Sequence, residues 1–197
     1  MLHLRSLKTR NLGPLDLELA SGECVSLQGP SGSGKSLLLR AIADLDPSEG
    51  DILLDGRSRS QVPAPQWRRK IGYVPAEPGW WASRVDQHFE AWHRASENLR
   101  TLSIPSDCGS WPISRLSTGE RQRLGLIRAL STGPQVILLD EPTAALDPET
   151  TEAVEAIITE RCRTDGLAAI WVTHREDQAR RVAKRHFRII GNGIVQA

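Results

Sequence analysis

A glycine-rich segment near the N-terminus of this chain fits the pattern G-x-x-x-x-G-K-[ST]. Its glycines allow backbone conformations with positive φ and let amide groups approach anionic oxygens without an intervening Cβ atom. The apolar run Cys24–Leu27 precedes the segment, and the helix-forming run Leu37–Ala43 follows it. This order predicts a P-loop, which binds phosphates at the positive end of a helix; the alternative is a turn that carries a lysine by chance. The motif consists of Gly29, Pro30, Ser31, Gly32, Ser33, Gly34, Lys35 and Ser36.

Two residues at the end of the motif carry side-chain chemistry. Lys35 is expected to place a positive charge on the β- and γ-phosphates, and the Ser36 hydroxyl is expected to bind Mg²⁺. The segment alone therefore predicts binding of a nucleoside triphosphate or a related compound.

Composition and charge narrow the class of protein. A chain of 197 residues suits one compact domain, and a net charge of +1 gives no global field toward nucleic acid or anionic lipid. Cys24, Cys108 and Cys162 match neither a disulfide framework nor a zinc-ligand spacing. No apolar stretch reaches the length that spans a bilayer, so we expect any membrane role to depend on a partner.

Strand-like and helix-like segments alternate along most of the chain, which predicts an α/β fold with a mostly parallel sheet. Residues 2–19 alternate in polarity around a turn and predict an antiparallel β portion near the N-terminus. Val136–Leu139 and Ala168–Val172 are continuous apolar runs, typical of parallel strands covered on both faces. Helices are predicted from Leu116 to about Leu130 and from Pro148 to about Arg163.

The middle of the chain is rich in aromatic residues. Trp80 and Trp81 lie beside a Gly/Pro turn and fit either an exposed contact surface or the core. The residues that recur at near-helical intervals after this turn, and that predict an amphipathic helix, are Val85, Phe89, Trp92, Leu99 and Leu102.

Two acidic residues end the apolar run Val136–Leu139. Asp140 can place a carboxylate beside Mg²⁺, and Glu141 can polarise a water for attack on the γ-phosphate. Paired acids at the end of a strand are also common in solvated loops. With a P-loop upstream in the same α/β chain, the catalytic interpretation is favoured.

Together with the P-loop and the acidic pair, further motifs of the sequence resemble those of the ATP-binding-cassette (ABC) ATPases. Leu116–Glu120 matches the signature of that family, usually written L-S-G-G-Q. Ser117 and Glu120 also fit the capping-box pattern of an ordinary helix start, and the two interpretations are compatible. A capped helix N-terminus with Gly119 in its first turn offers backbone amide dipoles to an anion. In this family that anion is the γ-phosphate bound by the opposite subunit.

Two more segments resemble the family, in the expected order. Ala145–Asp147 resembles the D-loop, although Asp147 also fits the N-cap of a helix that begins at Pro148. Thr173–Arg175 follows an apolar run and resembles the segment that carries the switch histidine, which makes His174 a contact for the γ-phosphate. A lone histidine at the end of a strand is otherwise a polar loop residue.

The resemblance covers essentially the whole chain and implies a P-loop NTPase with a mostly parallel core sheet, an N-terminal antiparallel β portion and a small helical lobe. It implies a single ABC ATPase domain over residues 1–197, with a core at about 1–75 and 132–197 and a lobe at about 76–131. It also implies that Mg-ATP binds between two subunits, a homodimer in the ATP-bound state, arranged head to tail. The implied catalytic residues are Lys35, Glu141 and His174, the implied metal ligands are Ser36 and Asp140, and the implied contacts to the partner's nucleotide are Ser117, Gly119 and Asp147.

The sequence departs from the family at several positions. Ala76 stands where the family has a glutamine that contacts Mg²⁺ and the attacking water, so either water or Glu77 must replace that contact. No aromatic residue precedes Trp67 to stack on adenine, which leaves His3 or Arg10 for weak stacking. The remaining departures are Thr118 for the first signature glycine and Leu37, which offers only its backbone amide near the α-phosphate.

The resulting prediction is an ATP-hydrolysing subunit of an ABC transporter, located in the cytoplasm on the inner face of the membrane through a separate permease. The permease is expected to dock near Ala76–Arg84, and no nucleic acid is expected as a partner. Two alternatives stay open: an ABC ATPase that acts outside transport, and a weakly hydrolysing nucleotide-binding regulator.

Overall fold

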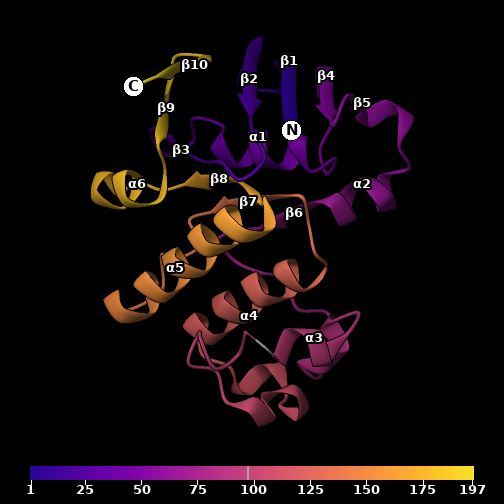
Figure 1. The fold of residues 1–197 in the computed structure, drawn as a ribbon, viewed down its shortest axis with the longest axis vertical. Coiled ribbons are helices and arrows are strands. Elements are labelled where there is room, and N and C mark those ends of the chain that lie inside the picture. The colour runs from indigo at the N-terminus through magenta and orange to yellow at the C-terminus, as the bar shows by residue number, and fades with distance from the viewer. Residues whose placement is uncertain (97) are drawn as a thin grey trace.

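The computed structural model describes residues 1–96 and 98–197, which form two sheets and the helices around them (Figure 1). The strands are β1 (Leu2–Lys8), β2 (Leu15–Leu19), β3 (Cys24–Gln28), β4 (Glu49–Leu54), β5 (Arg57–Ser58), β6 (Ile71–Val74), β7 (Val136–Asp140), β8 (Ala168–Val172), β9 (Arg185–Ile190) and β10 (Gly193–Gln196). The α-helices are α1 (Lys35–Ile42), α2 (Ala64–Lys70), α3 (Trp92–Ser96), α4 (Thr118–Ser131), α5 (Pro148–Asp165) and α6 (Glu176–Val182).

The two sheets differ in strand direction. One sheet has the order β2-β1-β4-β5 and is antiparallel throughout, as the alternating N-terminal pattern predicted. The other has the order β10-β9-β3-β8-β7-β6, in which the strands from β9 to β6 are parallel and β10 pairs antiparallel with β9. The predicted α/β class, a mostly parallel sheet with an antiparallel β portion, is therefore confirmed.

The parallel sheet brings the chemically important segments to one edge. In its strand register Leu27 of β3 pairs with Val172 of β8, and Val172 pairs with Asp140 of β7. Three neighbouring strands thus end at the same level, and the P-loop, Asp140 and the segment with His174 follow their carboxyl ends. This edge is where open α/β sheets bind their ligands.

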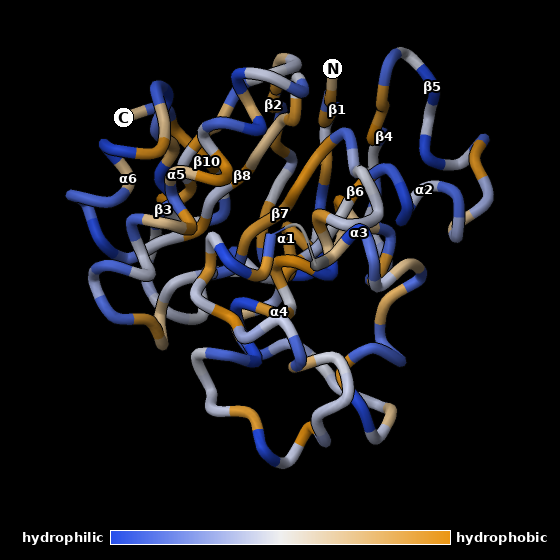
Figure 2. Tube along the Cα trace, turned by 60° about the horizontal axis from the view of Figure 1, so that its bottom comes forward, coloured by the Kyte–Doolittle hydropathy of each residue, from blue (hydrophilic) through white to orange (hydrophobic). Residues whose placement is uncertain are grey.

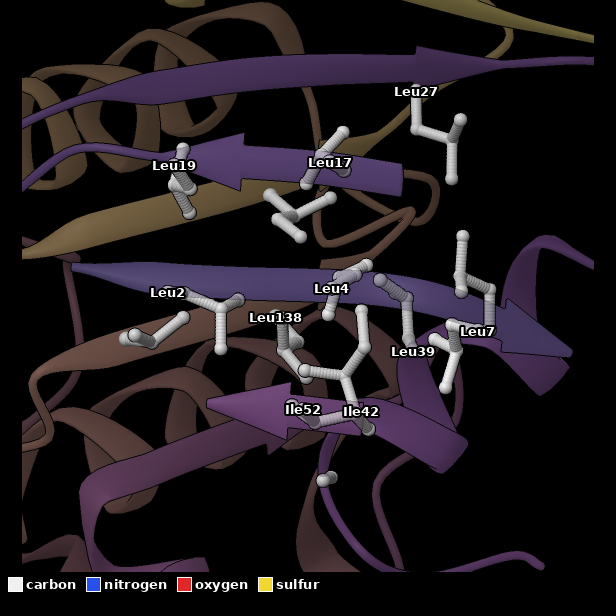
Figure 3. Close-up of a cluster of buried hydrophobic side chains, with 14 of the residues drawn as sticks. Leu2, Leu4, Leu7, Leu17, Leu19, Leu27, Leu39, Ile42, Ile52 and Leu138 are labelled. Carbon is white, nitrogen blue, oxygen red and sulfur yellow. The ribbon is translucent and has the colours of Figure 1, made fainter. Parts of the chain in front are cut away.

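Alternation along the central strands explains how both faces of the parallel sheet are covered. Val136 and Leu138 of β7 belong to a core cluster shared with α1 and the antiparallel sheet, whereas Ile137 and Leu139 belong to a second cluster shared with α4 and α5. Successive side chains of a strand point to opposite faces, so one apolar run supplies both cores. Figure 3 shows the first cluster, and Figure 2 shows apolar segments along β7 in the middle of the molecule with mostly hydrophilic outer loops.

The predicted amphipathic helix between Val85 and Leu102 is wrong. The structure has a 3₁₀ turn at Asp86–His88, the short helix α3 and further turns from residue 98, while Glu97 lies outside the described residues. Side chains compete with the helix here, because Gln87 Oε1 accepts a hydrogen bond from the amide of Arg84 at 3.0 Å and His88 bonds other backbone groups. The apolar residues are nevertheless buried or packed against the second core cluster.

α3, α4 and the turns between them lie together at the end of the molecule away from the antiparallel sheet (Figure 1). In residues 1–96 and 98–197, none of the helices combines the length and apolarity that crossing a lipid bilayer requires.

Candidate functional site

The P-loop connects β3 to α1 and wraps over the first turn of the helix. Gly34 caps α1 with a φ of 97°, and a Cβ at this position would lie 3.1 Å from Cγ of Leu12. The positive φ favours glycine at this position, and a Cβ would also require the Leu12 side chain to shift slightly. A cleft of about 350 Å³ lies beside the loop and the first turn of α1. The cleft is lined by Asn11, Ser31, Gly32, Gly34, Lys35, Ser36, Leu37, Glu141 and His174.

Lys35 lies beneath the loop. Its Nζ donates hydrogen bonds to the carbonyl oxygens of Gly29 and Pro30, each at 2.8 Å, and the residue is 6% exposed. Burial lowers the pKa of Lys35 below its ordinary value, and the carboxylates of Glu141 and Asp140 partly offset this effect. A cation held among carbonyl oxygens at the base of a phosphate loop can neutralise the charge of a phosphate in the cleft.

The two carboxylates at the end of β7 face different partners. Asp140 is 5% exposed, and its Oδ2 accepts a hydrogen bond from the Tyr73 hydroxyl at 3.3 Å. Burial and the Asp140 carboxylate raise the pKa of Tyr73 well above its ordinary value, so this hydroxyl stays a donor. Glu141 has a φ of 49°, and its Oε1 lies 2.8 Å from Nε2 of His174. The backbone turn thus separates a buried carboxylate from one that faces the cleft.

The signature segment and Asp147 lie outside this cleft. Ser117 caps α4 in a reciprocal capping box with Glu120, in which Ser117 Oγ accepts from the amide of Glu120 at 3.2 Å and Glu120 Oε2 accepts from the amide of Ser117 at 2.8 Å. A Cβ on Gly119 would lie 3.3 Å from the carbonyl oxygen of Ala145, so the tip of α4 packs beside the segment that leads to Asp147. Ser117 and Asp147 are both exposed. The α4 tip is therefore exposed at Ser117, while Gly119 packs against Ala145 of its own chain.

Asp147 has the local role that its sequence predicted. Its carboxylate accepts hydrogen bonds from the amide of Thr150 at 2.9 Å and from the Thr150 hydroxyl at 2.7 Å, and Pro148 occupies the first turn of α5. The hydrogen bonds from Thr150 hold the pKa of Asp147 below its ordinary value. The cap is therefore ionised at neutral pH.

The sequence matches a known protein family over most of its length. The profile of the ABC transporter family matches residues 12–144, which include the P-loop, the signature segment and both carboxylates. The chain belongs to the ABC transporter family.

Two relatives align with most of this ABC cassette. Protein STAR1 of Oryza sativa subsp. japonica is 36% identical over 194 residues, which cover 92% of this chain and 56% of that protein. The methionine import ATP-binding protein MetN of Xanthomonas oryzae pv. oryzae is 35% identical over 191 residues, which cover 88% of this chain and 57% of MetN. The chain thus spans somewhat more than half the length of these relatives.

A solved cassette has the same fold over its whole length. The dimeric ATP-binding cassette MJ0796, solved in a post-hydrolysis state with ADP and Pi, superposes with a TM-score of 0.88 at 27% identity and covers 100% of this chain and 98% of that one. The predicted family and the P-loop α/β fold are confirmed by these similarities.

Two residues predicted to hold Mg²⁺ carry suitable oxygen donors, although Ser36 lines the cleft and Asp140 is not among the residues that line it. Ser36 supplies a hydroxyl and Asp140 a carboxylate, which are hard oxygen ligands of the kind that Mg²⁺ binds. The described residues contain no group of three or more His, Cys, Asp or Glu side chains arranged for a metal. A Mg²⁺ ion held by Ser36 and Asp140 would take its remaining ligands from phosphate oxygens and water.

The structure also shows residues that the sequence patterns did not single out. Tyr73 bonds Asp140, Asn11 lines the cleft, and Gln122 and Gln178 bond the turn that follows Glu141. For Tyr73, the sequence pattern that could have indicated this role is a tyrosine hydroxyl on an otherwise apolar strand. The residues that line the cleft do not include His3 or Arg10, the two side chains expected to stack on a base.

Proposed function

We propose that this ABC cassette binds Mg-ATP between two copies of the chain, arranged head to tail, and hydrolyses it to drive a separate membrane permease. The observation that carries the proposal is the Glu141–His174 contact of 2.8 Å in the same cleft as Lys35 and Ser36. A carboxylate in this place can orient or deprotonate a water, and Lys35, the loop amides and Mg²⁺ can neutralise the charge that develops on the phosphates.

The second copy completes the site in this proposal. Ser117 and Thr118 are exposed outside the cleft of their own chain, at the positive end of a 14-residue helix. A partner's γ-phosphate can bind there, with Asp147 beside it. We further propose a core of about residues 1–75 and 132–197 and a lobe of about 76–131 that presents the α4 tip.

The segment Ala76–Arg84 is the proposed contact with the permease, which would hold the cassette at the cytoplasmic face of the membrane. Trp81 is 73% exposed, and the guanidinium of Arg128 lies 4.8 Å from the ring centre of Trp80 and 4.9 Å from that of Trp81. An exposed aromatic side chain next to a cation fits a protein interface.

The test measures ATP turnover and dimerisation of the purified chain. We expect Mg²⁺-dependent phosphate release whose specific rate rises with protein concentration. Glu141→Gln should slow release about 10²–10³-fold and should accumulate an ATP-bound dimer in size-exclusion chromatography. Equal, slow turnover in wild type and Glu141→Gln while both bind ATP would reject hydrolysis as the function. It would favour the alternative of a weakly hydrolysing nucleotide-binding regulator.

A second variant tests dimerisation independently of ATP binding in the cleft. Thr118→Glu adds a carboxylate at the exposed start of α4, which suits the dipole of that helix but repels the phosphates of a partner's nucleotide. ATP binding to the monomer should therefore be unchanged, whereas the ATP-bound dimer should be lost. A normal dimer in this variant would reject the head-to-tail arrangement.

A further inference from the structure

The turn that connects Glu141 to Ala145 is held by two buried glutamine side chains from different helices. Gln122 comes from α4 and is 2% exposed, and Gln178 comes from α6 and is 1% exposed. Neither lines the P-loop cleft. Each carries a neutral amide that donates and accepts hydrogen bonds at the same end, so each can bridge two backbone or hydroxyl groups.

Gln122 bridges the two ends of the turn. Its Nε2 donates to the carbonyl oxygen of Glu141 at 2.9 Å, and its Oε1 accepts from the amide of Ala145 at 3.1 Å. Gln122 lies one helical turn after Thr118, at the start of α4. A side chain near the solvent-exposed tip of α4 is thus bonded directly to the backbone of Glu141.

Gln178 connects the middle of the turn to the segment with His174. Its Nε2 donates to Oγ1 of Thr143 at 2.9 Å, and its Oε1 accepts from Oγ1 of Thr173 at 2.7 Å. Thr173 Oγ1 in turn accepts from the amide of Arg175 at 3.1 Å, which closes the backbone around His174. Gln178 therefore ties the backbone on the Glu141 side to the backbone on the His174 side.

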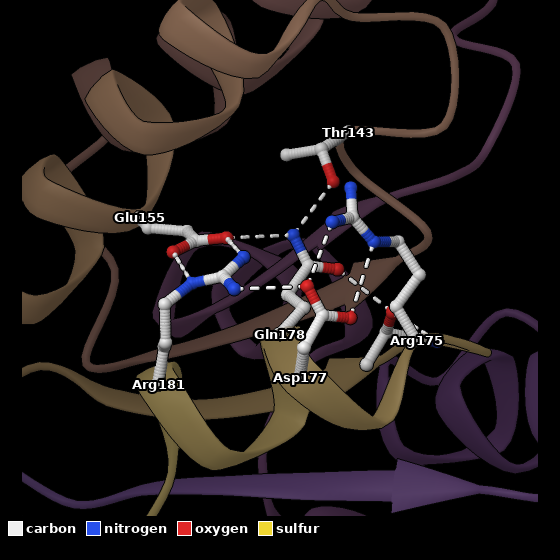
Figure 4. A network of polar contacts seen from close by, with 7 residues as sticks. Thr143, Glu155, Arg175, Asp177, Gln178 and Arg181 are labelled. Atoms are coloured by element: carbon white, nitrogen blue, oxygen red, sulfur yellow. Dashed lines mark hydrogen bonds and ion pairs between the residues drawn. The ribbon is translucent and has the colours of Figure 1, made fainter.

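Glu155 fixes which way the Gln178 amide points. Glu155 Oε1 accepts from Gln178 Nε2 at 3.0 Å, and the same carboxylate is held by Nε and Nη2 of Arg181, each at 2.8 Å (Figure 4). Burial alone would raise the pKa of Glu155, but the hydrogen bonds from Arg181 and Gln178 outweigh it and hold the pKa below its ordinary value. An ionised carboxylate only accepts, so the NH₂ of Gln178 must face Glu155 and its oxygen must face Thr173.

We propose that Gln122 and Gln178 are positioning residues for ATP hydrolysis, and that Gln122 transmits displacement of the α4 tip to Glu141. The proposal rests on the proposed head-to-tail function. In that arrangement the partner's nucleotide contacts the α4 tip, and because Gln122 bonds both ends of the turn, the turn follows α4. Gln178 holds Thr143 and the His174 segment, so the motion changes how Glu141 faces His174. In this proposal Gln122 and Gln178 are the route by which ATP bound at one site of the dimer alters the other site.

The experiment measures ATP turnover against ATP concentration and hydrogen exchange of the residues 141–147 amides. Gln122→Glu keeps an acceptor for the Ala145 amide but sets a carboxylate against the Glu141 carbonyl, and Gln178→Glu does the same against Glu155. We expect either substitution to lower kcat about tenfold or more with KM for ATP within about twofold, because the phosphate loop is untouched. We expect Gln122→Glu also to bring the Hill coefficient from above one to about one.

Exchange in the nucleotide-free protein gives a readout that does not depend on hydrolysis. Gln122→Met removes both hydrogen bonds to the turn and should speed exchange of the residues 141–147 amides about tenfold. Trp67→Phe is the matched control, because it removes a buried hydrogen bond to the carbonyl oxygen of Ile42 at 2.9 Å, remote from the turn. It should lower Tm while leaving the kcat, the Hill coefficient and the exchange of the turn unchanged.

The outcomes separate this inference from the proposed function. A wild-type protein without turnover rejects the proposed function, whereas unchanged exchange of the turn in Gln122→Met rejects the positioning role whatever the turnover. A wild-type kcat and Hill coefficient in Gln122→Glu would reject the proposal that Gln122 transmits displacement of the α4 tip to Glu141. A fall in Tm with normal kcat below the melting range would show a structural role alone and would also reject the proposal.

Discussion

Nε2 of His174 and Oε1 of Glu141 lie 2.8 Å apart at the carboxyl ends of two neighbouring strands, β8 and β7. The side chains are 43% and 32% exposed, so water and a phosphate can reach both. The amide of Glu141 also donates to the carbonyl oxygen of Val172 at 3.1 Å, which joins the two strand ends directly before the side chains meet. The backbone therefore brings these two side chains together.

His174 should orient the Glu141 carboxylate and contact the γ-phosphate. His174→Ala removes the donor and should lower kcat about 10²-fold, within the range that positioned acid–base groups supply. His174→Gln places an amide donor nearby and should keep more of the turnover. Steady-state phosphate release measures both variants, and equal loss in the two would argue against a hydrogen-bonding role.

Ala76→Gln should raise Mg²⁺-dependent turnover. Ala76 is exposed and borders a cavity of about 310 Å³ that is separate from the P-loop cleft, so a longer side chain fits without displacing the core. If water now occupies the place of the missing amide, the new side chain supplies an ordered ligand for Mg²⁺ and the attacking water. Turnover measured across a Mg²⁺ titration checks this prediction. An unchanged rate would contradict the account in which water replaces the side chain.

His88→Leu should loosen the aromatic loop and destabilise the protein. Nε2 of His88 accepts from the amides of Trp81 and Ala82, each at 2.9 Å, and the ring lies edge-on to Trp80 and Trp81. Leaving such amides unsatisfied costs about 1–3 kcal/mol, which lowers Tm by several degrees in a chain of this size. Differential scanning calorimetry measures the change.

Trp81→Ala is the control for the same loop. Trp81 is 73% exposed, so its removal should leave Tm nearly unchanged but weaken sedimentation with membranes that contain the permease. A wild-type Tm in His88→Leu would show that these hydrogen bonds do not stabilise the loop.

Glu155 should make stability depend on acid pH. The folded pKa of Glu155 is lowered from its ordinary value of 4.5, so the unfolded chain takes up a proton first as the pH falls. The stabilisation is fully present above pH 4.5 and is lost as the pH falls through the folded pKa. The difference in unfolding free energy between wild type and Glu155→Gln should therefore shrink below that pH.

Urea unfolding at a series of pH values measures this difference. Glu160→Gln is the matched control, because its partner Arg163 is 71% exposed and a surface ion pair contributes little. A wild-type minus Glu155→Gln difference that stays constant through the acid range would contradict the linkage.

Much of the candidate site could be predicted because its residues are adjacent in sequence to recognisable strands and helices. The P-loop, Asp140 with Glu141, and Ser117 with Glu120 each carry a local pattern whose physical reason is local as well. The predicted capping box and the Asp147 cap both form in the structure. Gln122, Gln178 and His88 have no such pattern, because a single polar residue in a helix or turn looks the same whether it is solvated or buried.

Local patterns along the chain were enough to predict most strands and helices, the phosphate loop and the acidic pair, because hydrophobic periodicity, glycine conformation and helix capping act over a few residues. Tertiary contacts set the turns and short helix of residues 85–96 and 98–102, the exposure of Ser117 at the α4 tip, and the burial of the two glutamines that hold the turn after Glu141. Those features depend on hydrogen bonds between segments far apart in the chain. Their energies depend on burial, which exists only once the core has formed.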